Sequence, residues 1–487
     1  MHRRHRLSAL FATLVTAVAS FGWLSPAAQA SAAPGGRELN IVAHEDDDVI
    51  FLNPDIQNSI TAGRMVRTVY VTAGNLAHDG ADFDYWQSRE RGALAAYATM
   101  GGKVTQQLTG TESYAYFSTL YDFSSHTVPG ACGAQPCTID VWTLKGTPTP
   151  GQVSVTFLRI SGANTGTSMW PLEKLWQGSL TSLMTVGPIG ISYADSTARQ
   201  SCTPGSATNS AGCRTYTLDQ LTSLMGGIMQ DFAPDRIRLQ DPSGTDYTTA
   251  LRDHTDHMHG ARVALEAYWN YLKRAPADTP GLLLYRAYYT GPADGFPGLP
   301  PNVSGAPLSA KDAALNNDCV FDNQTTGPGC YQTPDGWAQR RYALAPLPLL
   351  PGPVANGVLL DDGQLGCLGA AGGSVGLADC RLSQSWVLDR VGHLQFIPNG
   401  QCLTIPPSSQ VAGVSGPVQL GPCATATSWL FLTDGALLGS HSKVLKAASD
   451  GTLQVTDLFS YNADLQQGGV GNLSVIDLTD LGSRWAQ

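Results

Sequence analysis

The chain has 487 residues, of which 43% are hydrophobic and 14% are charged, a composition typical of a folded protein with room for two or three domains. Its formal net charge of −10 excludes the long-range attraction to a polyanion that nucleic-acid binding needs, and no basic stripe offsets this charge. We therefore expect no nucleic-acid partner.

The first 30 residues have the pattern of a secretory signal peptide. A basic start at 2–6 precedes an apolar stretch at 7–23, and Ala28-Gln29-Ala30 forms a small-residue cleavage site. Because the apolar stretch contains Ser and Thr, ends at Ser25-Pro26 and is followed by no stop-transfer charges, a membrane anchor is the weaker interpretation. We expect a secreted, extracellular protein that begins near Ser31 and has no membrane span in its mature form.

Strands and helices are predicted to alternate in the region that follows. Short apolar runs predict buried strands at 39–43, 65–71 and 153–160. Helical spacing of apolar residues predicts helices at 85–100, 218–232 and 257–272. This alternation predicts an α/β fold with a mainly parallel sheet and helices on both faces.

An acidic segment with one histidine, His44-Glu45-Asp46-Asp47-Asp48, follows the first predicted strand. In an open α/β sheet, ligands bind at the carboxyl ends of the strands. His44 and Asp47 are three residues apart where the strand gives way to a helix, so both can face one point, and their donor atoms suit zinc. Asp46 between them is placed to act as general base for a water on the metal. Such an acidic run by itself more often caps a helix or lies in solvent.

A second cluster, Asp253-His254-Thr255-Asp256-His257, opens the last predicted helix of this region. His254 and His257 are three residues apart, which places both rings on one face of the first turn. One of them can complete a three-ligand zinc site while the other stays free for substrate. Three protein ligands leave an open position for water, which is the pattern of a catalytic zinc site. The next histidine, His259, is predicted to lie on another face of the helix, at the surface.

The two motifs resemble those of the PIG-L/LmbE family of N-acetylglucosaminyl deacetylases and related amidases. The family motif Ala-His-Pro-Asp-Asp-Glu is similar to the segment Ala43–Asp48, and the family motif His-x-Asp-His is matched by the segment His254–His257. The resemblance covers roughly residues 38–275 and implies a Rossmann-like fold. It also implies zinc-dependent removal of an acetyl group from the nitrogen of an amino sugar.

The resemblance further implies a role for each motif residue. Zinc would be held by His44, Asp47 and His257. Asp46 would be the base, His254 would stabilise the oxyanion or protonate the leaving amine, and Asp256 would orient a neighbour.

The chain departs from the family at three positions. Glu45 replaces the usual proline and Asp48 the usual glutamate, and neither position is a ligand in the family. Arg89 is followed three residues later by Gly92, where the family tends to have glutamate. We expect Arg89 to contact the substrate.

Ten cysteines form five close pairs along the chain. An even count at short separations in an exported protein favours disulfides over a thiolate metal site, which usually shows paired CxxC spacing. The expected pairs are Cys132/Cys137, Cys202/Cys213, Cys319/Cys330, Cys367/Cys380 and Cys402/Cys423.

A proline cluster separates two regions of different pattern. We expect a hydrolase domain at 31–345, a linker at 346–353 and a further domain at 354–487. The last region shows three segments of roughly 40 residues, each with an early apolar pair and a late tryptophan. These pairs are Cys367-Leu368 with Trp386, Cys402-Leu403 with Trp429, and Val444-Leu445 with Trp485.

These repeats resemble the ricin B-type β-trefoil lectin family, which implies an all-β trefoil domain that anchors the enzyme on a glycan. In lectin-active repeats an Asp commonly follows the Cys-Leu pair. Here the continuations are Gly369-Ala370, Thr404-Ile405 and Lys446-Ala447, so a purely structural role stays open beside carbohydrate binding.

The combined expectation is a secreted zinc-dependent deacetylase that acts on an N-acetylated amino sugar or glycan. Two alternatives stay open. One is an amidase acting on a non-sugar acyl amide, and the other is a glycan-binding protein whose hydrolase domain is inactive.

Overall fold

The computed structural model describes residues 35–75, 85–148, 151–164, 168–190, 212–242, 253–274, 280–291, 299–322 and 336–344, single positions between 202 and 209, and, with short gaps, 352–457. The predicted signal peptide and most of the predicted linker therefore lie outside the described residues. Gly352 and Pro353, the last two linker residues, belong to strand β13. Within the described ranges, no helix combines the length and the apolar character needed to cross a membrane.

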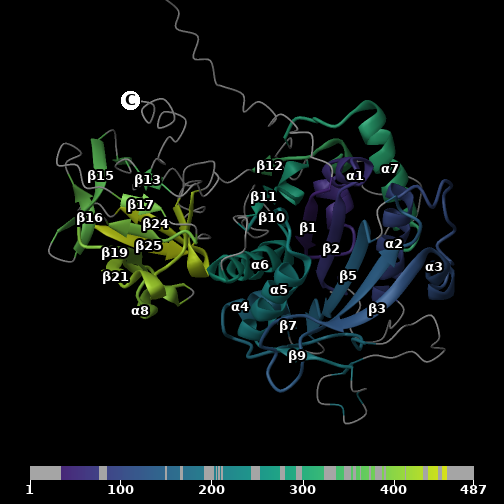
Figure 1. The fold of residues 1–487 in the computed structure, drawn as a ribbon, viewed down its shortest axis with the longest axis horizontal. Coiled ribbons are helices and arrows are strands. Elements are labelled where there is room, and N and C mark those ends of the chain that lie inside the picture. The colour runs from purple at the N-terminus through teal and green to yellow at the C-terminus, as the bar shows by residue number, and fades with distance from the viewer. Residues whose placement is uncertain are drawn as a thin grey trace, which may run out of the picture. The chain divides into compact units, whose positions relative to one another are not determined.

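A mainly parallel sheet organises the first region (Figure 1). Its strands are β1 Arg37–Val42, β2 Met65–Thr72, β3 Tyr121–Thr127, β4 Thr138–Leu144, β5 Val153–Ile160, β10 Arg236–Gln240, β11 Gly281–Tyr285 and β12 Ala343–Leu344. Their order is β12-β11-β10-β1-β2-β5-β4-β3. The central five strands, from β11 to β5, are parallel, whereas β12 pairs antiparallel with β11, β4 with β5, and β3 with β4. The predicted α/β class with a mainly parallel sheet is confirmed.

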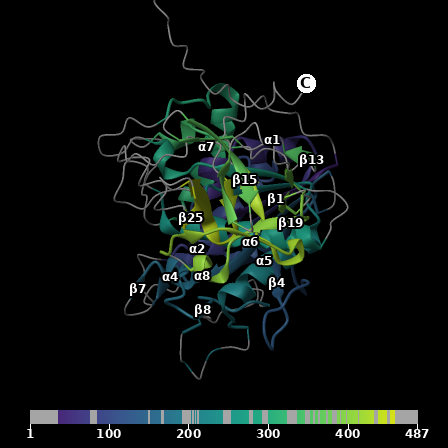
Figure 2. The same ribbon diagram turned by 90° about the vertical axis from the view of Figure 1, so that its left-hand side faces the viewer.

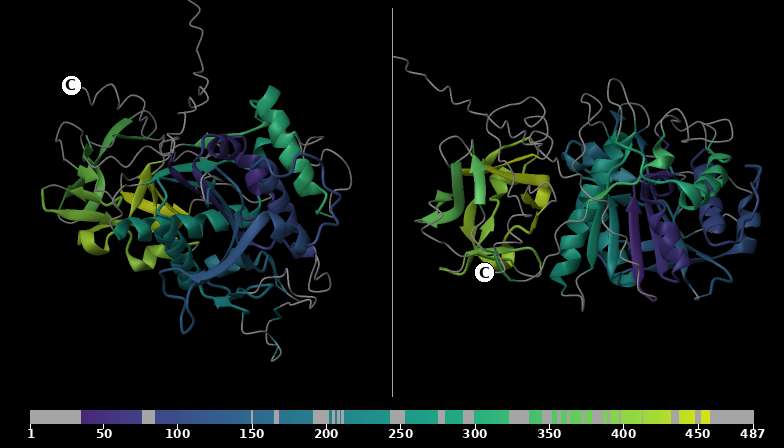
Figure 3. Two further views of the ribbon diagram at one scale, coloured as in Figure 1. Left: turned by 45° about the vertical axis from the view of Figure 1, so that its right-hand side comes forward. Right: turned by 90° about the horizontal axis from the view of Figure 1, so that it is seen from above.

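Helices cover both faces of this sheet (Figures 1 and 3). They are α1 Asp55–Thr61, α2 Tyr85–Met100, α3 Tyr114–Leu120, α4 Pro171–Trp176, α5 Leu218–Phe232, α6 Thr255–Lys273 and α7 Gly305–Cys319. Ile41 of β1 packs in a core with Ile228 of α5 and Val263 of α6. Tyr70 of β2 belongs to the core on the other side, together with Leu94 of α2. The sheet is therefore buried on both faces, as parallel sheets require.

Smaller elements complete the region. They are the π-helix η1 Asp48–Leu52, the 3-10 turns η2 Tyr288–Thr290 and η3 Trp337–Gln339, and two hairpins formed by β6 Ala163–Asn164 with β7 Ser168–Met169 and by β8 Leu183–Met184 with β9 Thr215–Tyr216. Three of the five predicted disulfides are confirmed, namely Cys132–Cys137, Cys202–Cys213 and Cys402–Cys423. The other two pairs involve residues outside the described side chains.

The C-terminal region consists of antiparallel strands (Figure 2). One sheet contains β13 Gly352–Val354, β14 Val358–Asp361, β15 Gln364–Ala371, β16 Ser374–Ala378, β17 Trp386–Leu388, β18 Leu394–Phe396, β19 Gln401–Thr404 and β21 Gln419–Gly421. The other contains β20 Gly416–Pro417, β22 Trp429–Phe431, β23 Leu437–Gly439, β24 Lys443–Ala447 and β25 Leu453–Asp457. The short helix α8 Pro407–Gln410 precedes β20, and the 3-10 turns η5 Cys423–Thr425 and η6 Ser440–Ser442 flank β22 and β23.

An equivalent hydrogen bond occurs within each of the first two predicted repeats. The buried indole of Trp386 donates from Nε1 to the carbonyl oxygen of Leu368 at 3.0 Å, and that of Trp429 donates to the carbonyl oxygen of Leu403, also at 3.0 Å. In each repeat the late tryptophan thus binds the backbone of the early apolar pair. The Trp485 of the third repeat lies outside the described residues, and the trefoil itself stays a prediction.

Candidate metal and catalytic site

The first motif occupies the carboxyl end of β1, a central strand of the sheet. All five residues from His44 to Asp48 are at most 7% exposed. The chain leaves β1 at Val42 and enters η1 at Asp48, so the motif lies in the turn between strand and helix. Burying five consecutive polar side chains costs free energy unless each has a hydrogen-bond or ion-pair partner.

The second motif forms the start of α6. His254 is its N-cap, and the imidazole Nδ1 accepts a hydrogen bond from the backbone N–H of Asp256 at 3.2 Å. His257 follows in the first turn and is fully buried. Although 213 residues separate His257 from His44, the nearest nitrogens of the two rings are 3.2 Å apart.

The three predicted zinc ligands converge. Nδ1 of His44 lies 3.3 Å from Oδ2 of Asp47, and Nε2 of His257 lies 2.9 Å from Oδ1 of Asp47. Ligand atoms around a tetrahedral zinc ion with bonds of about 2.0–2.1 Å are separated by about 3.3–3.4 Å. The three donor groups thus have nearly the spacing that one zinc ion imposes.

Carboxylates outside this group orient both imidazoles. Asp256 Oδ2 lies 3.3 Å from Nε2 of His44, and Asp253 Oδ1 lies 2.6 Å from Nδ1 of His257. Each carboxylate holds the proton on the ring nitrogen that it faces, which leaves the other nitrogen free to bind a metal. The predicted orienting role of Asp256 fits this geometry, and Asp253 plays the same part for His257.

Electrostatics favour a cation at this point. Although burial opposes protonation, Asp47 and Asp256 raise the pKa of His44 to about 10. Burial also opposes protonation of His257, but Asp47 and Asp253 raise its pKa to about 9. Oδ1 of Asp47 is buried and accepts no hydrogen bond of good geometry from the residues that the structure describes. A metal ion bound by His44, Asp47 and His257 would take the place of the protons on the two imidazoles and would give Oδ1 of Asp47 a partner. The residues present therefore fit zinc.

His254 lies beside the ligands in a different protonation state. Burial, and then the charges of His44 and His257, lower its pKa well below the ordinary value. Because Nδ1 accepts the Asp256 N–H, the proton of the neutral ring is on Nε2. The sequence analysis left open whether His254 stabilises the oxyanion or protonates the leaving amine, and this environment favours a neutral N–H donor. One ring nitrogen from each of His44, His254 and His257 lies within 4.8 Å of the other two, so His254 is an alternative candidate ligand.

Asp46, the predicted base, is held by Arg89 of α2. The guanidinium Nη2 lies 2.8 Å from Oδ1 of Asp46, and Nε lies 3.3 Å from Oε2 of Glu45. Asp322, in the segment after α7, lies 3.8 Å from Nη1 on the other side. Although burial opposes the charge, these carboxylates, with Asp46 first, raise the pKa of Arg89 well above its ordinary value. The substrate contact predicted for Arg89 stays a prediction beside this ion pair.

The two unusual motif residues are buried and hold their protons more tightly than usual. Burial raises the pKa of Glu45 to about 8, against the opposing charge of Arg89. Burial also raises the pKa of Asp48 to about 7, although Tyr97 and Tyr70 donate hydrogen bonds to its carboxylate at 2.6 and 3.0 Å. Both side chains are buried, and their absence from the ligand set stays a prediction.

Comparison with known proteins adds little to this geometry. No family model and no curated protein matches the chain. An N,N'-diacetylchitobiose deacetylase from Pyrococcus horikoshii is similar in structure with a TM-score of 0.28 and 13% identity, over 59% of this chain and 74% of that one. A 4-carboxy-2-hydroxymuconate hydratase from Pseudomonas putida has a TM-score of 0.29 and 11% identity, over 59% and 82%. Likenesses this weak show nothing about the function of this chain.

Aromatic side chains that the sequence analysis did not single out surround the imidazoles. Trp170 lies 4.7 Å from the His254 ring and Tyr288 lies 4.8 Å from the His257 ring, measured between ring centroids. Trp337 stacks on Tyr288 at 4.8 Å. These residues come from segments far apart in sequence, namely the N-cap of α4, η2 and η3, and no local pattern links them to the two motifs.

The prediction for His259 was wrong. Its side chain is buried, Nδ1 lies 2.7 Å from the carbonyl oxygen of Thr255, and Nε2 lies 2.9 Å from Arg262. The face of α6 that carries His259 is covered by other residues of the fold, which helical spacing alone does not show.

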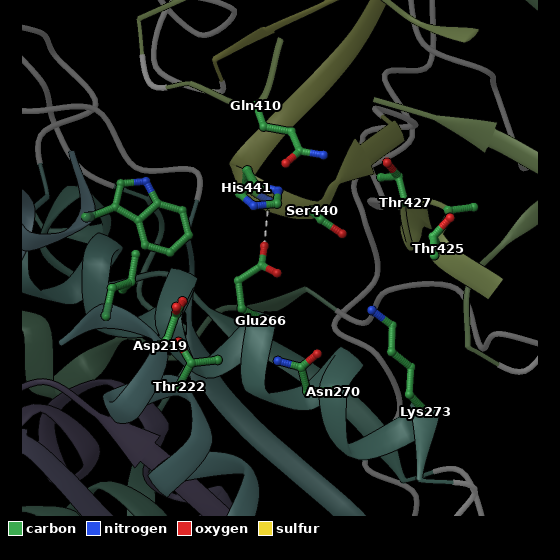
Figure 4. A pocket seen from close by; sticks show the side chains of 13 residues that line it. Asp219, Thr222, Glu266, Asn270, Lys273, Gln410, Thr425, Thr427, Ser440 and His441 are labelled. Carbon is green, nitrogen blue, oxygen red and sulfur yellow. Dashed lines mark hydrogen bonds between the residues drawn. The ribbon is translucent and has the colours of Figure 1, made fainter. Parts of the chain in front are cut away.

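A pocket of about 320 Å³ is lined by side chains of α5, α6 and residues 410–441 (Figure 4). Within it, Oε1 of Glu266 accepts a hydrogen bond of 2.5 Å from the backbone N–H of His441. Burial raises the pKa of Glu266 to about 7. None of the residues that line this pocket belongs to the two motifs, so it is separate from the candidate site.

Proposed function

We propose that the chain is a secreted zinc-dependent hydrolase that removes an acetyl group from the nitrogen of an amino sugar or glycan. The observation that carries this proposal is the convergence of His44, Asp47 and His257 with the carboxylate of Asp46 beside them. The similarity of both motifs to those of the PIG-L/LmbE family supports the choice of substrate class.

His44, Asp47 and His257 would hold the zinc ion. When bound, zinc lowers the pKa of a coordinated water to about 7 and polarises the acyl carbonyl group. A site with three protein ligands would be of the catalytic rather than the structural type.

Asp46 carries the proton in this proposal. Its carboxylate takes a proton from the attacking water as the new C–O bond forms, and the ion pair with Arg89 holds the carboxylate in position for that step. The protonated Asp46 then donates to the nitrogen as the C–N bond breaks. The products are acetate and the free amine.

His254 would stabilise the charge that develops on the acyl oxygen. A neutral imidazole with its proton on Nε2 is a fixed hydrogen-bond donor, and the loss of one such donor in comparable sites costs about 3–4 kcal/mol of transition-state stabilisation. Because the ring is anchored at the N-cap of α6, it needs no rearrangement during the reaction.

The C-terminal region would form a trefoil that holds the enzyme on a glycan. Its support is the hydrogen bond from the late tryptophan to the early apolar pair, which recurs in two repeats. The three confirmed disulfides are consistent with export.

The test is a screen of the purified full chain for acetate release from N-acetylglucosamine oligomers and from acyclic acetamides, together with metal analysis. We expect close to one zinc ion per chain and turnover of the sugars. Turnover of the acyclic amides alone would identify a non-sugar amidase. Glycan binding without turnover in the zinc-loaded protein would identify an inactive hydrolase domain.

A further inference from the structure

Two aromatic side chains flank the imidazoles of the site without a part in the proposed chemistry. The rings of Trp170 and Tyr288 stand almost perpendicular to that of His254, at centroid distances of 4.7 and 6.2 Å. Tyr288 also contacts His257 at 4.8 Å. Neither aromatic residue is fully buried, although both lie beside the proposed reaction centre.

The backbone of Trp170 is in a conformation that its residue type disfavours. It has φ 67° and ψ 60°, in the left-handed region that glycine adopts without cost. Pro171 follows at the first position of α4, and a proline disfavours helical backbone angles in the residue before it. Such outliers persist where a side chain must be held in one place, and they cluster at ligand-binding positions.

Tyr288 is held by a second aromatic residue. The ring of Trp337 stacks on it at 4.8 Å with an interplanar angle of 19°, and the indole Nε1 of Trp337 donates to the carbonyl oxygen of Tyr288 at 3.0 Å. Phe51 packs against the same tyrosine at 5.6 Å. The tyrosine ring therefore presents a rigid surface beside His254 and His257.

We propose that Trp170 and Tyr288 form the subsite for the pyranose ring of the acetylated amino sugar, an inference that rests on the proposed function. A pyranose has an apolar face of C–H groups and a polar edge of hydroxyls, which suits amphipathic aromatic side chains in a partly open site. His254 is proposed to contact the acyl oxygen, so a ring attached to the amide nitrogen reaches side chains adjacent to His254. The subsite selects sugars over acyclic acetamides.

The test uses a zinc-loaded Asp46→Asn background, in which substrate binds without turnover. Calorimetry compares N-acetylglucosamine with N-acetylethanolamine, which has the acetamide but no ring. We expect Trp170→Gly, which suits the left-handed backbone, to weaken N-acetylglucosamine binding at least tenfold and N-acetylethanolamine binding less than twofold. Trp170→Phe should retain most of the sugar affinity.

Trp176→Ala is the matched control, because this half-buried tryptophan ends the helix that Trp170 caps but lies 6.5 Å from His259, measured between ring centroids. Trp170→Leu keeps an apolar side chain without a flat ring, and it replaces the glycine variant if zinc content or thermal unfolding shows that the latter is misfolded. An equal loss of affinity for both ligands, or no loss of affinity for either, would overturn the proposed subsite. In that case sugar deacetylation by the otherwise unmodified enzyme would leave the proposed function intact, whereas turnover of acyclic amides alone would reject both.

Discussion

The carboxylate Oδ1 of Asp253 lies 2.6 Å from Nδ1 of His257, four residues further along the chain. This contact directs Nε2 of the same imidazole toward Asp47 and toward Nδ1 of His44. The position of one proposed zinc ligand thus depends on a residue that is not itself a ligand.

Removal of the Asp253 carboxylate should weaken zinc binding. In Asp253→Ala the imidazole of His257 loses the partner that sets its tautomer, and such outer partners contribute about 10–100-fold in metal affinity. Competition with a chelating dye measures the effect. Asp122→Ala, which removes an exposed carboxylate paired with Lys145, is the control. Unchanged zinc affinity in Asp253→Ala would contradict this role.

Asp46→Asn should retain zinc and lose nearly all turnover. The amide is isosteric with the carboxylate but cannot accept the proton of the attacking water, and general-base catalysis contributes about 10²–10⁴-fold in rate. Metal content and kcat are to be measured on the same preparation. A variant with full zinc and an unchanged kcat would remove Asp46 from the mechanism.

Arg89→Gln should lower kcat about tenfold or more, because Asp46 loses the cation that holds it at 2.8 Å. Steady-state kinetics separates this role from a contact with substrate, which the sequence analysis predicts and which would appear as a raised KM. Arg91→Gln is a control on the same helix, since its guanidinium hydrogen-bonds backbone carbonyls of Gln87 and Glu112. No change in kcat and KM would contradict both roles of Arg89.

Lys311 should make the stability of the fold depend on pH. Burial lowers its pKa from 10.5 to about 7 in the folded chain, where Nζ donates to the carbonyl oxygens of Asn53 and Arg340. Between pH 7 and 10.5 the unfolded chain therefore binds more protons at this residue, so its contribution to the free energy of unfolding rises with pH.

Urea unfolding at pH 7 and pH 9.5 measures this linkage. The rise should be smaller in Lys311→Met, whereas Lys103→Met, which removes an exposed lysine, controls for the loss of a charge. An identical pH dependence in the original chain and in Lys311→Met would contradict the buried position of this amine.

Much of the fold was predictable because it is encoded locally. The predicted helix 218–232 and the predicted strand 153–160 have the bounds of α5 and β5. The helix begins with a capping box between Thr217 and Gln220, and its apolar positions recur with helical spacing. Caps and periodicity act between near neighbours in sequence, so they can be read without the tertiary structure.

The candidate ligands were predictable for a related reason. His44 and Asp47 stand where a buried strand ends, and His254 and His257 stand where a helix begins, so spacing and chemistry together single them out. Their meeting point required only that both segments reach the same edge of one sheet, which the α/β pattern already implied.

Only the tertiary structure decided what surrounds these residues. The contacts of Arg89 with Asp46, of Trp170 with His254 and of Tyr288 with His257 join elements that are distant in sequence. The burial of His259 and the neutral state of His254 also follow from packing, because burial and neighbouring charges set a pKa. The sequence determined which side chains can carry the chemistry, whereas long-range packing decided their partners and protonation, since neither depends on local spacing.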